Sequence, residues 1–169
     1  MLTTRIRDRC PSAAFRTLAY APDFGVSFTK PGIDLSGKAT IVASDGSKLA
    51  ATGAVFEIST SDLDNLNKAE GPGYERHNEF RVACLHTGKS ITAHTYVAKE
   101  HRSQLKPYDW YLALVIAGIV EHGLGPNYVS AFRAIKYDID TDTCRQSRQT
   151  AIEELQRAGY PDYTALLQN

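Results

Sequence analysis

The stretch of sequence that decides the fold class is Tyr108–His122, YDWYLALVIAGIVEH. Its apolar side chains recur three and four residues apart, as in a core-facing helix, at Leu112, Val115, Ile116, Ile119 and Val120. Gly123 follows directly and can adopt the left-handed conformation in which many helices end. Two further helices are predicted downstream, over residues 127–134 and 145–158. The last third of the chain is therefore expected to be mainly helical.

The sequence upstream of this helix predicts strands. Alternating apolar and small side chains indicate strands over residues 14–21 and 24–29, separated by a turn at Pro22-Asp23. Residues 31–37 are expected to form a loop. Two hairpins follow: strands 38–43 and 49–58 flank the turn 44–47, and strands 79–87 and 91–99 flank Gly88-Lys89. Strands followed by helices indicate an α+β fold with a curled, mainly antiparallel sheet.

Two short helices complete the predicted elements. The first covers residues 3–9 and ends before Pro11, because the residue that precedes a proline disfavours the helical conformation. The second starts at Ser61-Asp62-Leu63-Asp64, which resembles a capping box, and ends at Gly71-Pro72-Gly73. We expect one domain over residues 1–169, with a C-terminal helical extension at about 140–169.

Composition and charge narrow the class of protein. The 169 residues are 43% hydrophobic and 22% charged, which is ordinary for a soluble globular protein. Lysine plus arginine equals aspartate plus glutamate, 19 against 19, so no net charge attracts nucleic acid or an anionic membrane. The longest apolar run, Leu112–Val120, is too short to span a bilayer, and no secretory signal is recognised. Three widely spaced cysteines, Cys10, Cys84 and Cys144, form no disulfide framework, so a cytoplasmic protein is expected.

The motifs of several common enzyme classes are absent. The sequence has neither a glycine-rich phosphate loop nor the Gly-x-Ser-x-Gly motif of serine hydrolases. The best metal-ligating set is Cys84, His86 and His94 in the second predicted hairpin. With Gly88-Lys89 as the turn, Cys84 and His94 would lie on opposite faces of the sheet, where one zinc ion cannot reach both. We therefore expect no metal site.

Glu70 is the acidic residue with the most unusual position. It stands at the end of a predicted helix, where the negative end of the helix dipole disfavours a carboxylate by about 0.3–1 kcal/mol. Two interpretations are open: a solvated helix-end acid, or a functional carboxylate held where stability alone would not put it. Arg5, Arg7 and Arg9 form a basic cluster that we interpret as solvated rather than as a phosphate site.

Several short motifs occur in order along about three quarters of the chain: Leu2-Thr3-x-Arg5-Ile6, Pro11–Phe15 (PSAAF), Asp64–Gly71 (DNLNKAEG), Thr95-Tyr96, Tyr111, Gly118 and Gly123-Leu124. In this order they resemble the gamma-glutamylcyclotransferase family. The resemblance implies a small mixed, mainly antiparallel β-barrel with surrounding helices. It also implies that Glu70 is the catalytic proton shuttle. For substrate binding it points to Tyr111, Tyr74, Met1 and Leu2.

The implied reaction converts gamma-glutamyl amino acids or amines to 5-oxoproline and a free amino acid or amine. The α-amine of the substrate is the nucleophile, so no Ser–His or Cys–His pair is required, and one carboxylate can act first as base and then as acid. The resemblance implies no cofactor and a small gamma-glutamyl compound as the partner. Nucleic acid and membrane are not expected, and a homodimer is left open.

The start of the chain carries an expectation of its own. Family members have an apolar strand and a Tyr-Gly-Ser-Asn loop whose backbone amides hold the glutamyl group, and Met1 falls directly after the expected asparagine. The resemblance therefore implies that residues 1–169 alone have little activity and that upstream codons restore it. The competing hypothesis is a non-catalytic small-molecule or partner-binding module on the same fold.

Overall fold

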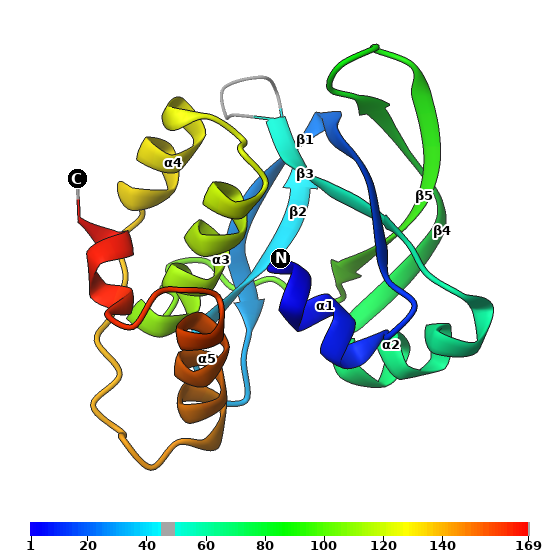
Figure 1. Ribbon diagram of the computed structural model, residues 1–169. Helices are drawn as coiled ribbons and strands as arrows, with labels where there is room; N and C mark the ends of the chain where they lie inside the picture. Colours follow the sequence, from blue (N-terminus) through cyan, green and yellow to red (C-terminus); the bar gives the residue numbers. More distant parts are fainter. Residues whose placement is uncertain (45–49, 169) are drawn as a thin grey trace.

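In the computed structural model, which describes residues 1–44 and 50–168, a curled sheet packs against a layer of helices (Figure 1). The strands are β1 (Ala14–Pro31), β2 (Gly37–Ala43), β3 (Ala50–Glu57), β4 (Tyr74–Cys84) and β5 (Ser90–Ala98). The helices are α1 (Thr3–Arg9), α2 (Leu63–Glu70), α3 (Asp109–Glu121), α4 (Pro126–Arg133) and α5 (Gln146–Arg157), with 3₁₀ turns η1 (Thr60–Asp62) and η2 (Tyr163–Leu167). The named strands pair antiparallel, so the predicted α+β class is confirmed. The predicted turn 44–47 extends outside the described residues.

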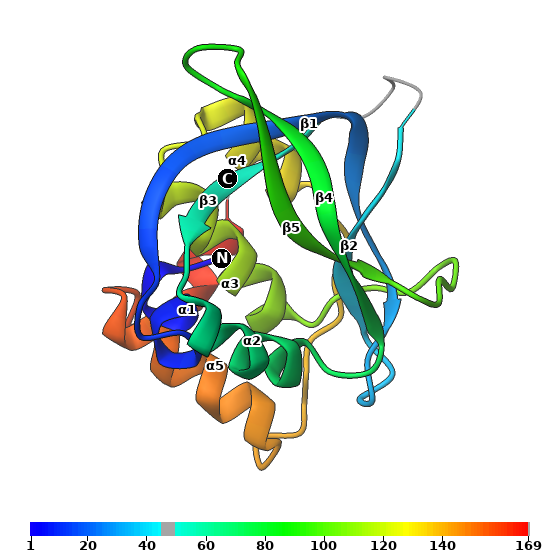
Figure 2. The ribbon, with the colours of Figure 1, turned by 90° about the vertical axis from the view of Figure 1, so that its right-hand side faces the viewer.

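The long strand β1 organises the sheet because it pairs with β3 in its first part and with β2 in its second. The expectation of two strands separated by a turn at Pro22-Asp23 is wrong, because β1 is continuous through these residues. The β1–β3 register instead shifts between Ala21 and Gly25. Proline has no N–H to donate, so it fits where the ladder is already interrupted, and the strand bends over the interior instead of turning back (Figure 2).

The sheet is curled but open within the described residues. Its order is β2-β1-β4-β5, and β3 pairs with β1. The outer strands β2 and β5 approach each other, and the Ala98 amide donates a hydrogen bond to Thr40 Oγ1 at 3.0 Å. No ladder of described residues joins β2 to β5, so the β-barrel implied by the resemblance is not closed in this structure.

The β4–β5 hairpin was predicted with the wrong turn. Gly88-Lys89 is not a two-residue turn, because Ala83 pairs with Ser90 and the Cys84 amide bonds to the Lys89 carbonyl. The loop is therefore residues 85–88, and Gly88 occupies its last position with φ of 68°. A glycine in this conformation ends a longer loop as readily as it forms a two-residue turn.

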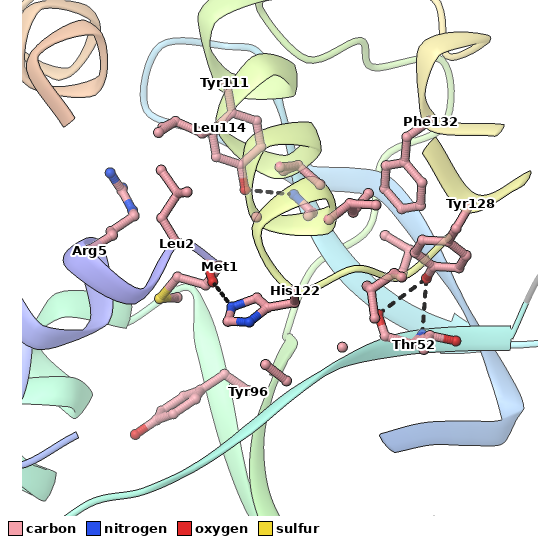
Figure 3. Close-up of a pocket in the computed structure, with 18 of the residues that line it drawn as sticks. Met1, Leu2, Arg5, Thr52, Tyr96, Tyr111, Leu114, His122, Tyr128 and Phe132 are labelled. Carbon is pink, nitrogen blue, oxygen red and sulfur yellow. Dashed lines mark hydrogen bonds between the residues drawn. The ribbon is translucent and has the colours of Figure 1, made fainter. Parts of the chain in front are cut away.

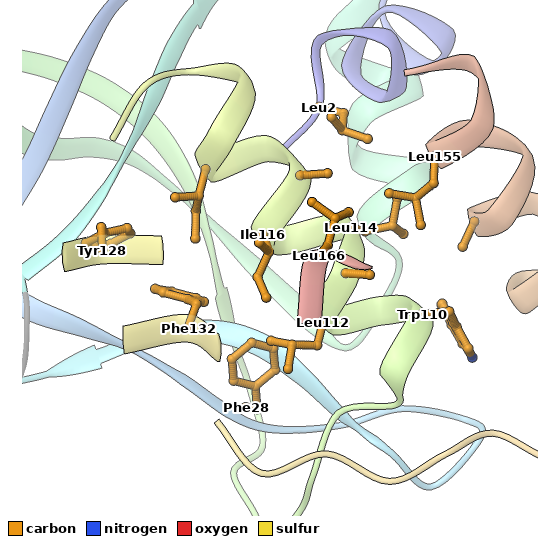
Figure 4. Close-up of a cluster of buried hydrophobic side chains, with 14 residues drawn as sticks. Leu2, Phe28, Trp110, Leu112, Leu114, Ile116, Tyr128, Phe132, Leu155 and Leu166 are labelled. Atoms are coloured by element: carbon orange, nitrogen blue, oxygen red, sulfur yellow. The ribbon is translucent and has the colours of Figure 1, made fainter. Parts of the chain in front are cut away.

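The apolar core lies around α3. Leu112 and Ile116 are fully buried, and side chains from α4, α5 and η2 close over them, among them Phe132, Leu155 and Leu166 (Figure 4). Helix α3 ends as predicted, with Gly123 at φ of 62°. Val120 departs from the prediction, since it is 41% exposed. The segment predicted as a C-terminal extension thus contributes to the same core as α3.

Helices α1 and α2 pack together on the side of the molecule away from α4 (Figure 1). Their contact is a small apolar cluster of Ile6, Cys10 and Ala13, against which Leu66 packs. The predicted capping box does not form. The Ser61 hydroxyl bonds to Ser59, the residue before η1, and the Asp62 carboxylate accepts hydrogen bonds from the Ser12 amide and hydroxyl. Long-range contacts to the loop after α1 thus replace the local cap.

Candidate functional site

A cavity of about 360 Å³ lies between α3 and the inner face of the sheet (Figure 3). A neighbouring cavity of about 570 Å³ runs along β3, β4 and β5 and shares lining residues with it, including Glu70, Thr95 and Tyr96. Glu70, Tyr74, Tyr111, Met1 and Leu2 all line the first cavity. The residues that the sequence singled out are therefore brought to one interior space.

Glu70 is the last residue of α2. Gly71 follows with φ of 74°, which turns the chain sharply toward β4. The Glu70 side chain is only 17% exposed, and its Oε1 lies 3.0 Å from the Nη1 atom of Arg9. The interpretation of Glu70 as a solvated helix-end acid is therefore wrong: the carboxylate is mostly enclosed and paired with a cation.

Tyr111 and Tyr74 bond to the backbone of the same residue of β2. The Ala39 amide donates to the Tyr111 hydroxyl oxygen at 3.1 Å, and the Tyr74 hydroxyl donates to the Ala39 carbonyl at 2.8 Å. Ala39 lies where the β1–β2 register shifts, between the pairs Ser27–Thr40 and Lys30–Lys38. The irregular ladder leaves the polar groups of Ala39 available to side chains, a common arrangement beside functional sites.

Both tyrosines remain protonated around neutral pH. Burial raises the pKa of the Tyr111 hydroxyl, and burial together with the neighbouring Tyr111 and Glu70 raises the pKa of Tyr74. The Lys38 ammonium lies 4.7 Å from the centre of the Tyr111 ring and 2.8 Å from Asp34 Oδ2. The Lys30 ammonium lies 5.1 Å from the centre of the Tyr74 ring. Each tyrosine is therefore held by a cation at its ring and by the Ala39 backbone at its hydroxyl.

Met1 and Leu2 also line the cavity, close to α3. Leu2 is 1% exposed and belongs to the apolar core. The Met1 carbonyl oxygen accepts a hydrogen bond from His122 Nε2 at 3.0 Å (Figure 3). A Cβ atom at Gly118 would lie 3.0 Å from the Met1 nitrogen, so glycine permits this close approach. Leu2 thus has a packing role besides its position in the cavity wall.

The arginines of α1 were misinterpreted from the sequence. Arg9 pairs with Glu70, and Arg5 lines the cavity and pairs with Glu154 of α5. Only Arg7 lacks a carboxylate partner among the described residues, and its Nε donates to the Ala13 carbonyl. The sequence pattern that could have indicated a role for Arg5 and Arg9 is their four-residue spacing, which puts them on one face of a helix.

Tyr96 and His122 also line the cavity and were not singled out for a role there. The Tyr96 hydroxyl donates to Asn67 Oδ1 on α2 at 2.7 Å. His122 stacks on Phe15, with ring centres 5.7 Å apart. The sequence could not reveal these contacts, because they join elements that are far apart along the chain.

The residues considered and rejected as metal ligands in the second predicted hairpin lie apart. Cys84 is buried beside Thr17, whereas His94 is exposed and bonds to Asn78. Across residues 1–44 and 50–168, no group of three or more His, Cys, Asp and Glu side chains has an arrangement that could hold a metal ion. Among the helices of those same residues, none is long and apolar enough to span a bilayer.

Comparison with known proteins places this arrangement in a family. The chain is 33% identical over 143 residues to the gamma-glutamylcyclotransferase of Homo sapiens, an alignment that covers 80% of this chain and 74% of that protein. The corresponding protein of Bos taurus is 31% identical over 142 residues with the same coverage. The chain belongs to the gamma-glutamylcyclotransferase family.

Two further comparisons agree with this family. The AIG2-like family matches residues 51–132, a range that contains Glu70, Tyr74 and Tyr111. A solved structure named gamma-glutamyl cyclotransferase superposes with a TM-score of 0.78 at 29% identity, covering 90% of this chain and 92% of the other. A crystal structure of an uncharacterized protein from Homo sapiens superposes with a TM-score of 0.77 at 30% identity and the same coverage. The gamma-glutamylcyclotransferase fold thus extends over most of the chain.

Proposed function

We propose that this protein is a gamma-glutamylcyclotransferase-type enzyme that converts gamma-glutamyl amino acids or amines to 5-oxoproline and a free amino acid or amine. The observation that carries the proposal is the enclosed carboxylate of Glu70 in the same cavity as the hydroxyls of Tyr74 and Tyr111, in a chain of this family. The family relationship does not favour the alternative of a non-catalytic binding module, since the named relatives are cyclotransferases.

Glu70 is assigned the proton transfers. Its carboxylate takes a proton from the α-ammonium of the substrate, and the freed amine attacks the γ-carbonyl carbon to form the new ring C–N bond. The original amide C–N bond then breaks as Glu70 returns the proton to the leaving nitrogen. The ring nitrogen gives up its second proton to the departing amine, which leaves as an ammonium. Acid–base catalysis of this kind contributes about 10²–10⁴-fold, and holding the extended substrate folded for ring closure adds to it. No cofactor enters these steps.

The two tyrosines are assigned complementary roles in binding. The Tyr111 oxygen accepts from Ala39, so its O–H remains available to donate to a carboxylate or carbonyl oxygen of the substrate. The Tyr74 O–H is used on Ala39, so its oxygen remains available to accept from the substrate ammonium. Met1 and Leu2 are assigned to the wall that limits the glutamyl chain on the α3 side.

Two broader assignments belong to the same proposal. The chain acts as one domain, because α5 and η2 share the core of α3. The protein is cytoplasmic, because its cysteines are unpaired and two of them, Cys10 and Cys84, are buried. Its partner is a small gamma-glutamyl compound, and a homodimer remains compatible with this function.

The direct test is release of 5-oxoproline from gamma-glutamyl-alanine, compared with a gamma-glutamylamine of similar size. The protein is assayed as residues 1–169 and with any codons that precede Met1 in the same reading frame, which tests the sequence-based expectation for the substrate loop. We expect 5-oxoproline and the free amine in equal amounts. Binding of both compounds without 5-oxoproline from either form would support the non-catalytic module instead.

A further inference from the structure

Arg9 is the cation closest to the proposed proton shuttle, and it reaches Glu70 from a different helix. The Arg9 Nη1 atom lies 3.0 Å from Glu70 Oε1, and the two side chains are 22% and 17% exposed. Arg9 is not among the residues that line either cavity, whereas Glu70 lines both. The guanidinium thus contacts the carboxylate from behind, on the side away from the cavity.

The position of Glu70 makes such a partner necessary. None of the residues of α2 is buried, so packing alone does not fix the orientation of the helix end. A glutamate has three rotatable bonds, and at the last position of a helix its charge is opposed by the dipole. Glu70 Oε1 bonds to Arg9, and no hydrogen bond to Oε2 is found within residues 1–44 and 50–168. One oxygen is therefore held, and the other is left for the substrate.

Arg9 is itself held firmly against α2. Ile6 on α1 and Cys10, directly after its last residue, are buried in the apolar cluster against which Leu66 of α2 packs. The next turn of chain adds the hydrogen bonds from Ser12 to Asp62, at the start of α2. These contacts set the distance between α1 and α2 independently of the Arg9–Glu70 pair.

We propose that Arg9 is a positioning residue for catalysis: it orients the Glu70 carboxylate toward the cavity without contacting the substrate. This inference rests on the proposed function of Glu70. An arginine suits the task because its planar guanidinium presents fixed donors and stays charged at all relevant pH values. Since Arg9 acts through Glu70, its loss lowers kcat and leaves KM nearly unchanged.

The experiment compares Arg9→Gln, Arg9→Lys and Arg157→Gln in whichever form of the protein is active. Arg157 is the matched control, because it also joins α1 to another helix, through Asp8 at 2.7 Å, but both side chains are about half exposed. We expect Arg9→Gln to lower kcat between about tenfold and 10²-fold, since small misplacement of a catalytic group has costs of this order. Arg9→Lys retains the charge and is expected to recover part of the loss, and Arg157→Gln is expected to match the parent.

A double variant separates positioning from general destabilisation. If Arg9 acts only through Glu70, adding Arg9→Gln to Glu70→Gln causes no further loss of kcat, whereas independent effects multiply. Thermal unfolding of each variant identifies any loss of fold. If the parent is active and Arg9→Gln is equally active, the role of Arg9 is wrong but the proposed function is not affected. The same conclusion follows if the double variant has a lower kcat than Glu70→Gln. A Glu70→Gln variant with parent activity, or a parent without activity, contradicts the proposed function and this inference together.

Discussion

Helices α3 and α2 both contribute to the cavity, but they are held in opposite ways. Nine of the thirteen residues of α3 are buried, including both Leu112 and Ile116 at 0% exposure. None of the eight residues of α2 is buried. Helix α2 is positioned by the packing of its half-buried Leu66 against α1 and by polar contacts at both ends, from Ser12 to Asp62 and from Arg9 to Glu70.

The difference indicates that α3 mainly stabilises the fold, whereas α2 mainly places the catalytic group. An apolar interface around α3 contributes stability that does not depend on any single contact. Polar contacts contribute little net stability but fix direction, and direction is what a proton shuttle needs. Substitutions in α3 should therefore affect mainly the free energy of unfolding, and substitutions in α2 mainly turnover.

The strongest test of this division is Glu70→Gln. Glutamine has the size of glutamate and can still accept a hydrogen bond from Arg9, but it cannot carry the proton. We expect kcat to fall by about 10²-fold or more, with little change in thermal unfolding. The measurement is 5-oxoproline release at saturating gamma-glutamyl-alanine. A variant that retains more than about a tenth of the parent kcat would remove Glu70 from this role.

The converse test is Leu112→Ala in α3. Because Leu112 is fully buried, its truncation leaves a cavity and should lower the free energy of unfolding by about 2–5 kcal/mol. Urea unfolding can be followed by the fluorescence of Trp110, the only tryptophan. Leu66→Ala in α2, where the leucine is half-buried, is the comparison and should cost about 1 kcal/mol. Equal costs at the two positions would contradict the difference between the helices.

Tyr111→Phe tests a residue that both packs in α3 and is assigned to substrate binding. Its ring packs in α3, and phenylalanine retains that packing, but the Ala39 amide loses its acceptor, so the free energy of unfolding should fall by about 1–3 kcal/mol. Loss of a hydroxyl that donates to a charged substrate group should lower kcat/KM by an amount equivalent to about 1.5–3 kcal/mol. Tyr111→Ala should in addition destabilise the fold. If the phenylalanine variant matches the parent in both kcat and KM, Tyr111 contributes packing only.

The smallest effect is expected at Asn67→Ala. Asn67 Oδ1 accepts hydrogen bonds from the Tyr96 hydroxyl at 2.7 Å and from Arg76 at 3.3 Å, which tie α2 to β4 and β5. Its loss should reduce stability by about 1 kcal/mol and lower kcat less than about tenfold. Asn65→Ala, at an exposed position of the same helix, is the control for helix propensity. A larger loss of turnover than Arg9→Gln produces would mean that the Asn67 contacts matter more than Arg9 for the placement of Glu70.

The sequence predicted what depends on local patterns. Helix α3 was predicted within a residue at each end, because its apolar spacing and Gly123 are both local signals. The β4–β5 hairpin was predicted, but its register was not. Gly88 fits both a two-residue turn with Lys89 and the last position of the loop 85–88. The continuity of β1 through Pro22 depends on two different partner strands, which no local pattern reveals.

In the candidate site, too, the sequence indicated individual residues but not the long-range contacts between them. Resemblance to a family indicated Glu70, Tyr74 and Tyr111, and the structure brings all three to one cavity. The pairing of Arg9 with Glu70 joins residues 61 positions apart, so charge counting favoured a solvated cluster instead. The capping box failed for the same reason, since Ser12 lies 50 positions from Asp62 and still displaced the local cap.

The backbone of Ala39, which bonds to both tyrosines, offers a way to observe the site. Its amide proton is covered by the Tyr111 hydroxyl, so exchange of that proton with deuterium requires β2 and α3 to separate. Its rate would therefore measure how often the two layers open around an empty or a filled cavity. A substrate that accepts the Tyr111 O–H would hold Tyr111 in place over the Ala39 amide and slow the exchange. A single amide resonance would then follow occupancy of the site without any chemical step.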